Sequence, residues 1–251
     1  MIGILGYGFV GKAVDKGFSK TDKIISDPLY NDVSIEDMMD TECIFVCLPT
    51  PTVNGKIEAT ILLNALKHLE ELEYSGLIII KSTVLPDLIK GYSNNVVCVP
   101  EFLSRATAHH DFINPHVLII GSNSIVTSHH TLAIFKKYSE VSIKNVHLTD
   151  IKTACILKYT MNTFNALKIT YLNEIYKVCG IEGIDYKEIV SVLERVPRMG
   201  TGLFDVPGPD GKYGFGGPCL PKDAESFAST YNINLIKEML ETNHDNRYKC
   251  N

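Results

Sequence analysis

MIGILGYGFVGK, residues 1–12, decides the fold of the first half of the chain. An apolar run is followed at once by Gly6, Gly8 and Gly11 in the spacing G-x-G-x-x-G, and the residues from Lys12 onward can form a helix. Glycines at this spacing permit a tight turn and let backbone N–H groups approach a pyrophosphate at the start of the helix. The stretch therefore predicts a strand, a turn and a helix that bind a dinucleotide.

An acidic residue follows the second apolar run. Asp27 lies nineteen residues beyond Gly8, at the end of KIIS. A carboxylate there can bind the ribose 2′-hydroxyl and repels a 2′-phosphate, so it favours NAD over NADP as the cofactor. The alternative is that the glycines serve only a tight turn and that Asp27 only begins the Asp-Pro turn.

Strand-like and helix-like stretches alternate through the first half. The stretch from Glu58 to Glu73 has apolar residues at spacings of three and four, which is typical of an amphipathic helix. The continuous apolar runs suit strands that are buried on both faces. We therefore expect an α/β fold with a Rossmann-like, doubly wound parallel sheet. The runs are MIGIL, KIIS, CIFVCL, LIIIK, VVCV and HVLIIG.

The pattern changes near Thr149. A stretch of about thirty residues has no proline and no glycine before Gly180, which predicts one long helix that Thr149 or Asp150 caps and Gly180 stops. Apolar residues fall on almost all of its sides, so we expect burial on most of them. A second helix is expected over Tyr186 to Glu194, before a loop rich in glycine and proline from Pro197 to Pro218.

These patterns define two expected domains. Residues 1–148 are expected to form a NAD-binding Rossmann-like domain. Residues 149–251 are expected to form a mainly helical central and dimerisation domain, which carries the long helix and a cysteine loop.

Composition excludes several classes of protein. The formal charge is −5 without a run of five like charges, so nothing indicates binding to nucleic acid or to a membrane. No signal peptide or membrane span is expected. The seven cysteines are scattered and odd in number, which favours a reducing, cytoplasmic compartment (the host cytoplasm if the gene is viral). We expect no metal site, because His109–His110 and His129–His130 lack partners at ligand spacing.

The segment GFGGPCLPKD, residues 214–223, is the most specific in the chain. Glycines let a backbone come close to a ligand, and the flanking prolines restrain the loop around Cys219. A helix is expected to begin near Pro221, so the positive end of its dipole and Lys222 both favour a thiolate at Cys219. The alternative is an inert buried thiol.

This segment resembles the active-site signature of the UDP-glucose and GDP-mannose dehydrogenases. Four other segments resemble that family in the same order along the chain, and the resemblance covers nearly all of it. They are CLPTP (residues 47–51), KSTVLP (81–86), PEFL (100–103) and KYTMNTFNALKITYLNE (158–174).

The resemblance implies a four-electron oxidation of a nucleotide sugar, with UDP-glucose as the expected substrate. The C6 alcohol becomes an aldehyde, the cysteine adds to it, a second oxidation gives a thioester, and water releases the carboxylate. NAD accepts a hydride in each oxidation. This chemistry needs a nucleophile, a cation for an oxyanion and a carboxylate that handles water or protons.

The family's nucleophile falls on Cys219, and its oxyanion-binding residues fall on Lys158 and Asn162. The last two are spaced i,i+4, so they share one face of a helix and can point at one oxygen together. The alternatives are that Lys158 is a solvated helix residue and that Asn162 bonds only within the helix.

Three further roles are implied by the resemblance. Asp223 positions water or takes part in proton transfer, Glu101 is the catalytic glutamate, and Thr83 helps to hold the water. The alternatives are a surface acid in a loop for Glu101 and a first-turn acid favoured by the helix dipole for Asp223.

Two sets of binding residues complete the prediction. NAD is expected to contact Gly6, Tyr7, Gly8, Phe9, Val10, Gly11, Asp27, Pro49, Thr50, Pro51, Ser82, Thr83 and Lys222. The nucleotide sugar is expected to contact Glu101, Phe102, Leu103, Arg105, Lys158, Asn162, Arg198, Tyr213, Phe215, Gly216 and Cys219.

The sequence departs from the family in two places. Arg105 stands where a second glutamate is usual, and a cation there could bind a substrate phosphate or carboxylate. The chain also stops at Asn251, before the second α/β domain that grips the nucleotide in typical members. If 251 residues are the whole natural protein, this loss is expected to lower kcat and raise KM. Arg198 resembles an arginine that reaches the partner subunit's sugar site, which implies a homodimer.

Other functions remain open. The substrate could be GDP-mannose or a UDP-N-acetylated sugar, because the motifs are shared across the group. A truncated, non-catalytic NAD-binding dimer is another alternative, although the catalytic residues are all present. A two-electron β-hydroxyacid dehydrogenase needs no cysteine in this loop, so Cys219 argues against it.

Overall fold

The computed structural model describes residues 1–92, 95–104 and 107–248. The chain forms two compact units. Unit 1 consists of Met1–Pro51 and Ile57–Lys158, and unit 2 of Thr52–Lys56 and Tyr159–Asn251.

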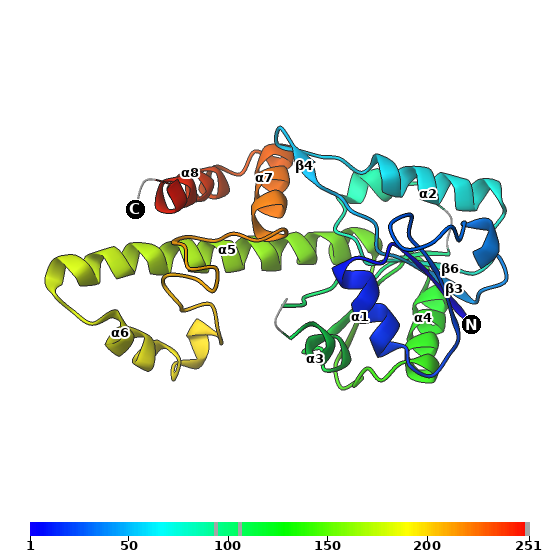
Figure 1. Ribbon diagram of the computed structural model, residues 1–251, viewed down its shortest axis with the longest axis horizontal. Coiled ribbons are helices and arrows are strands. Elements are labelled where there is room, and N and C mark those ends of the chain that lie inside the picture. Colours follow the sequence, from blue (N-terminus) through cyan, green and yellow to red (C-terminus); the bar gives the residue numbers. More distant parts are fainter. Residues whose placement is uncertain (93–94, 105–106, 249–251) are drawn as a thin grey trace. The chain divides into compact units, whose positions relative to one another are not determined.

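Unit 1 is built on a seven-stranded sheet with the order β2-β1-β3-β6-β7-β8-β9 (Figure 1). Neighbouring strands are parallel except β7 and β8, which are antiparallel. The expected α/β fold is therefore confirmed, with the correction that the sheet is mostly rather than wholly parallel. The strands are β1 (Ile2–Leu5), β2 (Lys23–Ser26), β3 (Cys43–Val46), β6 (Leu77–Ile80), β7 (Val96–Cys98), β8 (Leu118–Gly121) and β9 (Val146–Thr149).

The six apolar runs all form strands of this sheet. The seventh strand, β9, was not predicted, because His147 and Thr149 interrupt its apolar character and no residue of it is fully buried. The short strands β4 (Thr52–Val53) and β5 (Lys56–Ile57) were also missed, and they form a separate two-stranded hairpin in unit 2.

Alternate side chains of the strands enter two cores, one on each face of the sheet. Ile44 and Ile78 pack on one face against α2 (Thr60–Glu71) and the first turns of α5 (Ile151–Glu182). Phe45 and Ile79 pack on the other face against the remaining helices of the unit. Those helices are α1 (Phe9–Gly17), α3 (Ala108–Ile113) and α4 (Ile125–Tyr138). Unit 1 also contains the 3₁₀ helices η1 (Glu36–Met38) and η2 (Pro86–Ile89).

The long helix α5 has 32 residues. Asp150 caps it, since its carboxylate accepts the Thr153 N–H at 2.9 Å, as predicted. The predicted stop is wrong: Gly180 lies inside the helix, and the chain leaves it at Gly183, whose φ of +67° suits the left-handed conformation that ends helices. The helix is also less buried than expected, because it leaves an exposed apolar stripe that includes Phe164.

Unit 2 combines the rest of α5 with three further helices. The predicted second helix is confirmed as α6 (Tyr186–Leu193), and a helix does begin beside Pro221, as α7 (Leu220–Tyr231). The last is α8 (Asn234–Tyr248), and a 3₁₀ turn, η3 (Pro197–Met199), lies within the long loop. The hydrophobic core of unit 2 consists of Ala166, Phe215, Ala224, Ala228, Ile236 and Met239. None of the described helices is apolar over a length sufficient to cross a membrane.

Candidate active site

The glycine turn of unit 1 begins directly after β1. Gly6 has a φ of +92°, and a Cβ there would lie 2.8 Å from the Cys47 carbonyl oxygen. A Cβ on Gly11 would lie 2.1 Å from the Gly6 carbonyl oxygen. Gly8, in contrast, caps α1 and faces open space. The helix begins at Phe9, three residues earlier than expected, so the N–H groups after Gly8 are presented as an anion site requires.

Asp27 follows β2 and lies beside this turn. Its carboxylate accepts hydrogen bonds from the N–H groups of Tyr7 at 2.6 Å and Leu29 at 2.9 Å. It also begins a turn, since its carbonyl oxygen accepts the Tyr30 N–H at 2.8 Å. Asp27 therefore does begin a turn, as the alternative interpretation predicted. It is also half-buried beside the glycine turn, which is the position that a ribose-binding carboxylate needs.

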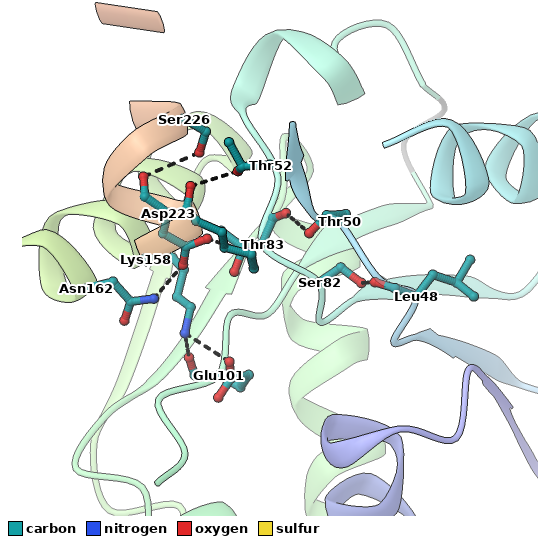
Figure 2. A network of polar contacts seen from close by, with 11 residues as sticks. Leu48, Thr50, Thr52, Ser82, Thr83, Glu101, Lys158, Asn162, Asp223 and Ser226 are labelled. Atoms are coloured by element: carbon teal, nitrogen blue, oxygen red, sulfur yellow. Dashed lines mark hydrogen bonds and ion pairs between the residues drawn. The ribbon is translucent and has the colours of Figure 1, made fainter. Parts of the chain in front are cut away.

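The loops after β3 and β6 are tied to each other at the carboxyl edge of the sheet (Figure 2). Thr50 Oγ1 donates to the Thr83 carbonyl oxygen at 2.8 Å, and Ser82 Oγ donates to the Leu48 carbonyl oxygen at 2.6 Å. The predicted Pro49 and Pro51 flank Thr50 and are exposed. The carboxyl edge of a parallel sheet is where dinucleotides bind in such folds, so the open space at Gly8 and these loops fit NAD.

Glu101 and Lys158 form a buried ion pair in unit 1 (Figure 2). Lys158 Nζ lies 2.9 Å from Glu101 Oε1 and also donates to the Glu101 carbonyl oxygen. The other carboxylate oxygen accepts the Leu103 N–H at 2.8 Å, and the Phe102 ring lies 5.2 Å from the Lys158 ammonium. Lys158 is 4% exposed, so it is not a solvated helix residue.

The charge of Glu101 is set by competing effects. Burial alone would raise the pKa of this carboxyl group, but the Lys158 charge, the Leu103 N–H and the Lys81 charge together hold the pKa below its usual value of 4.5. Glu101 is therefore ionised at neutral pH. A surface acid in a loop, the alternative considered above, would not be enclosed in this way.

Lys81 begins the segment KSTVLP, and the sequence predicts no role for it. It follows β6 directly and is 4% exposed. The signal was present in LIIIK, where a lysine ends an apolar run whose strand is buried on both faces.

Unit 2 contains a second buried carboxylate, Asp223 (Figure 2). Asn162 Nδ2 donates to Asp223 Oδ2 at 2.6 Å, and Lys222 forms an ion pair with Asp223 Oδ1. Asn162 thus does not bond only within its helix. The Lys222 charge is shared with Asp223, so its effect on a nearby thiolate is weaker than the sequence suggested. The Lys222 carbonyl oxygen accepts a hydrogen bond from Thr52 Oγ1 at 2.8 Å.

Cys219 lies at the N-cap position of α7, and it is half-buried. Pro221 occupies the first turn of that helix, and Asp223 is its first-turn acid. The unpaired N–H groups at a helix N-terminus favour a negative charge, so this position favours the thiolate form of a cysteine.

Three residues that the sequence did not single out hold the glycine-rich loop before Cys219. Asn173 Oδ1 accepts the Gly214 N–H at 2.8 Å. Asn243 Oδ1 accepts the Phe215 N–H at 2.7 Å, while its Nδ2 donates to the Phe215 carbonyl oxygen at 3.0 Å. Arg247, on the same helix, donates to the Gly214 carbonyl oxygen at 3.4 Å.

The remaining predicted residues occupy different environments. Arg198 lies exposed in η3, whereas the Phe215 side chain is buried in the core of unit 2. The Tyr213 carbonyl oxygen accepts from Arg247, and a Cβ on Gly216 would lie 2.7 Å from the Arg247 guanidinium. Arg105 lies outside the described residues.

Within residues 1–92, 95–104 and 107–248, no group of three or more His, Cys, Asp or Glu side chains is arranged to hold a metal ion.

Two family models match the chain. Residues 23–139 match the NAD-binding domain of the UDP-glucose/GDP-mannose dehydrogenase family, and residues 152–245 match the central domain of the same family. Together these ranges make up most of the chain.

Curated relatives agree with these models. UDP-glucose 6-dehydrogenase of Rickettsia bellii is 32% identical over 212 residues, which cover 80% of this chain and 48% of that protein. UDP-glucose 6-dehydrogenase TuaD of Bacillus subtilis is 30% identical over 226 residues, which cover 82% of this chain and 47% of that protein. The chain therefore spans about half the length of the curated relatives that it matches.

Solved structures show the same fold. A UDP-glucose dehydrogenase from Pyrobaculum islandicum gives a TM-score of 0.82 at 21% identity, covering 97% of this chain and 67% of that chain. A UDP-D-ManNAc dehydrogenase from Pyrococcus horikoshii gives a TM-score of 0.78 at 19% identity, covering 97% of this chain and 68% of that chain. From the two family models, NAD is the cofactor and the chain belongs to the UDP-glucose/GDP-mannose dehydrogenase family.

Proposed function

We propose that the chain catalyses the four-electron oxidation of a nucleotide sugar at C6, with UDP-glucose as the substrate and Cys219 as the covalent nucleophile. One observation carries the proposal: a half-buried cysteine occupies the N-cap position of α7 in a chain whose other unit has the glycine turn of a NAD-binding domain. The names of the relatives support UDP-glucose as the substrate.

The reaction passes through an aldehyde and a thioester. In the first oxidation the C6 alcohol loses a hydride and a proton and becomes an aldehyde. The Cys219 thiolate then adds to the aldehyde carbon, and loss of a second hydride gives a thioester. Water cleaves the C–S bond, which releases the carboxylate and restores the thiol. NAD supplies the hydride acceptor in both oxidations.

The other residues act on charge and water. Lys158 and Asn162 stabilise the oxyanion, since both are buried polar groups four residues apart on α5. Asp223 positions water or takes part in proton transfer, Glu101 is the catalytic glutamate, and Thr83 helps to hold the water. The two carboxylates are buried and bonded to fixed partners.

We further propose that the chain acts as a homodimer in a reducing, cytoplasmic compartment. The exposed stripe of α5 supports a dimer, because large apolar side chains on a free helix face favour association. None of the six described cysteines forms a disulfide, which fits a reducing compartment. The stripe consists of Met161, Phe164, Tyr171, Val178 and Ile181.

Two alternatives keep specific support. A UDP-N-acetylated sugar or GDP-mannose is possible as the substrate, since solved structures of this fold include a UDP-D-ManNAc dehydrogenase and a GDP-mannose dehydrogenase. A non-catalytic NAD-binding dimer is the second alternative, because the family model that matches residues 23–139 describes NAD binding alone.

NADH formation tests the proposal. The purified chain is incubated with NAD and, separately, with UDP-glucose, UDP-N-acetylated sugars and GDP-mannose, and NADH is measured by absorbance against the sugar acid formed. Two NADH per carboxylate from UDP-glucose is the expected result. NAD binding without NADH from any of these sugars would favour the non-catalytic alternative.

Two cysteine variants test the mechanism. Cys219→Ser is expected to abolish the sugar acid while NAD binding persists, because a hydroxyl is a far weaker nucleophile than a thiolate. Cys179→Ala, which removes a buried thiol from α5, is the control and should retain turnover. Unchanged turnover in Cys219→Ser rules out the covalent route.

A further inference from the structure

Lys81 is a buried lysine outside the Glu101–Lys158 ion pair. It ends the buried strand β6 and is 4% exposed. Within the part of the chain that the structure describes, no oxygen accepts a hydrogen bond from it and no carboxylate lies at ion-pair distance. Its nearest ring is that of Phe112, with the centroid 5.6 Å from Nζ.

An ammonium in this environment is costly. Burial lowers the pKa of Lys81 from 10.5 to about 8, although the charge of Glu101 acts in the opposite direction. The other titratable groups that face it are Cys47, Cys98 and Lys158. Buried lysines are rare unless they are paired, so a purely structural role would be better filled by an apolar side chain.

The Lys81 charge acts on the neighbouring ion pair between Glu101 and Lys158. Glu101 and Lys158 are in direct contact and cancel each other's charge. Lys81 and Glu101 follow the paired parallel strands β6 and β7, where the Val99 N–H donates to the Ile80 carbonyl oxygen at 2.9 Å, and both side chains are buried. Lys81 therefore adds a second cation beside the one carboxylate, and the cluster carries a net positive charge while Lys81 is protonated. Without Lys81, an oxyanion near Lys158 would meet a nearly neutral pair.

We propose that Lys81 is a positioning residue that acts through Glu101: its charge keeps the buried carboxylate ionised and gives the Glu101–Lys158 pair the net positive charge that favours an anionic ligand atom. The oxyanion of the reaction is that atom, so this inference rests on the proposed function.

The effect of the Lys81 charge on the ionisation of Glu101 can be tested without substrate. Glu101 is titrated by carbon-13 NMR in the wild type, Lys81→Met and Lys81→Arg, with Glu101→Gln used to assign the signal and the exposed Lys144→Met as the control. The pKa of Glu101 is expected to rise in Lys81→Met, because a nearby cation is removed, and to stay near the wild-type value in Lys81→Arg and Lys144→Met. An unchanged titration in Lys81→Met overturns the proposal.

Thermal melting separates positioning from structural support. Lys81→Met removes a buried charge that forms no ion pair with any described residue, and it keeps most of the side-chain volume, so its Tm at pH 7 is expected to equal or exceed that of the wild type. A lower Tm, with turnover falling in Lys81→Met and Lys81→Arg alike, would mean that the side chain only supports the fold.

Kinetics then test the link to the reaction. In Lys81→Met, kcat is expected to fall by between ten- and about 100-fold, with KM for NAD unchanged. This fall in kcat is smaller than the fall caused by removing a residue that donates directly to the oxyanion. The acidic limb of the pH profile should move to higher pH, since Glu101 is protonated more easily. Wild-type kcat in Lys81→Met overturns the proposal. A wild type that makes no NADH overturns the proposed function instead, and the Glu101 titration still decides about Lys81.

Discussion

Two glycine-rich loops, one in each unit, are shaped in different ways. In the loop of residues 6–11, a Cβ on Gly11 would meet the carbonyl oxygen of Gly6, a member of the same loop. In the loop of residues 214–217, a Cβ on Gly214 would meet Asn243, and one on Gly216 would meet Arg247, both on α8. In the first loop the close approaches of Gly6 and Gly11 are to backbone oxygens, those of Cys47 and of Gly6 itself, whereas in the second loop both close approaches are to side chains about thirty residues away in the sequence.

A short motif can specify a loop whose close approaches are to backbone atoms. Glycines at the right spacing permit those approaches, so the first loop can be identified from six residues. A loop that is held from outside needs partners that no local pattern reveals. Substitutions that disturb the first loop should therefore affect folding and binding differently from substitutions that disturb the second.

The largest effect is expected from Gly11→Ala. Its Cβ would lie 2.1 Å from a backbone oxygen that cannot move without opening the turn. We expect a loss of about 3 kcal/mol in the free energy of unfolding, at the upper end of overpacking effects. Urea denaturation, followed by circular dichroism, measures this loss.

Gly8→Ala is the matched variant in the same loop. Its Cβ meets no atom within 4 Å, and its φ of −75° suits alanine. We expect less than about 1 kcal/mol of destabilisation, because alanine is only a poorer N-cap than glycine. NADH affinity, measured by fluorescence, should fall at least tenfold, because the methyl group occupies the space for the pyrophosphate. Wild-type affinity would show that the cofactor does not approach Gly8.

The same contrast explains which predictions from sequence succeeded. The apolar runs, the strand–turn–helix at Gly6 and the helix at Pro221 follow from local rules of burial and helix initiation, and the structure contains them. The stop at Gly180 failed because a glycine within a long helix costs only about 1 kcal/mol, which packing can outweigh. The edge strand β9 was missed because exposure on one side removes its continuous apolar run.

In the candidate sites, too, local motifs were predictable from the sequence and long-range contacts were not. The resemblance singled out Glu101 and Lys158 separately, and the structure pairs them across 57 positions of sequence. No local pattern marks Asn173, Asn243 or Arg247, because an asparagine or arginine on a helix surface has the same sequence signature whether or not it holds a loop. Long-range hydrogen bonds are a property of the tertiary fold.

A smaller effect than that of Gly11→Ala is expected from Asn243→Ala. The change leaves the buried N–H and carbonyl groups of Phe215 without their partner. Because each unsatisfied buried group costs between 1 and 3 kcal/mol, we expect a loss of about 2 to 3 kcal/mol. Urea denaturation measures it, and the rate of Cys219 alkylation by iodoacetamide should change, since the loop that leads to the thiol is released.

Asn246 provides the control on the same helix. It is 1% exposed, and among the described residues neither its Oδ1 nor its Nδ2 has a hydrogen-bond partner. Asn246→Leu should change stability by less than about 1 kcal/mol or increase it, because it removes polar atoms that are buried without compensation. Equal losses in both variants would mean that burial on α8, and not the bonds to Phe215, determines the effect.

The smallest effect is expected from Asp210→Asn, which breaks the ion pair between Asp210 Oδ2 and Arg247 Nη2 at 2.7 Å. Asp210 is 45% exposed, so water and salt screen the pair, and we expect a loss of about 0.5 kcal/mol at pH 7. The hydrogen bond from Arg247 lowers the pKa of Asp210 below 3.8. This stabilisation is therefore present above pH 3.8 and disappears as the pH falls through the lowered pKa, and 1 M NaCl should reduce it at pH 7. Urea denaturation of the wild type and Asp210→Asn at several pH values measures the stabilisation that the ion pair contributes. A loss as large as that of Asn243→Ala, insensitive to salt, would mean that the surface pair and not the buried amide holds the second loop.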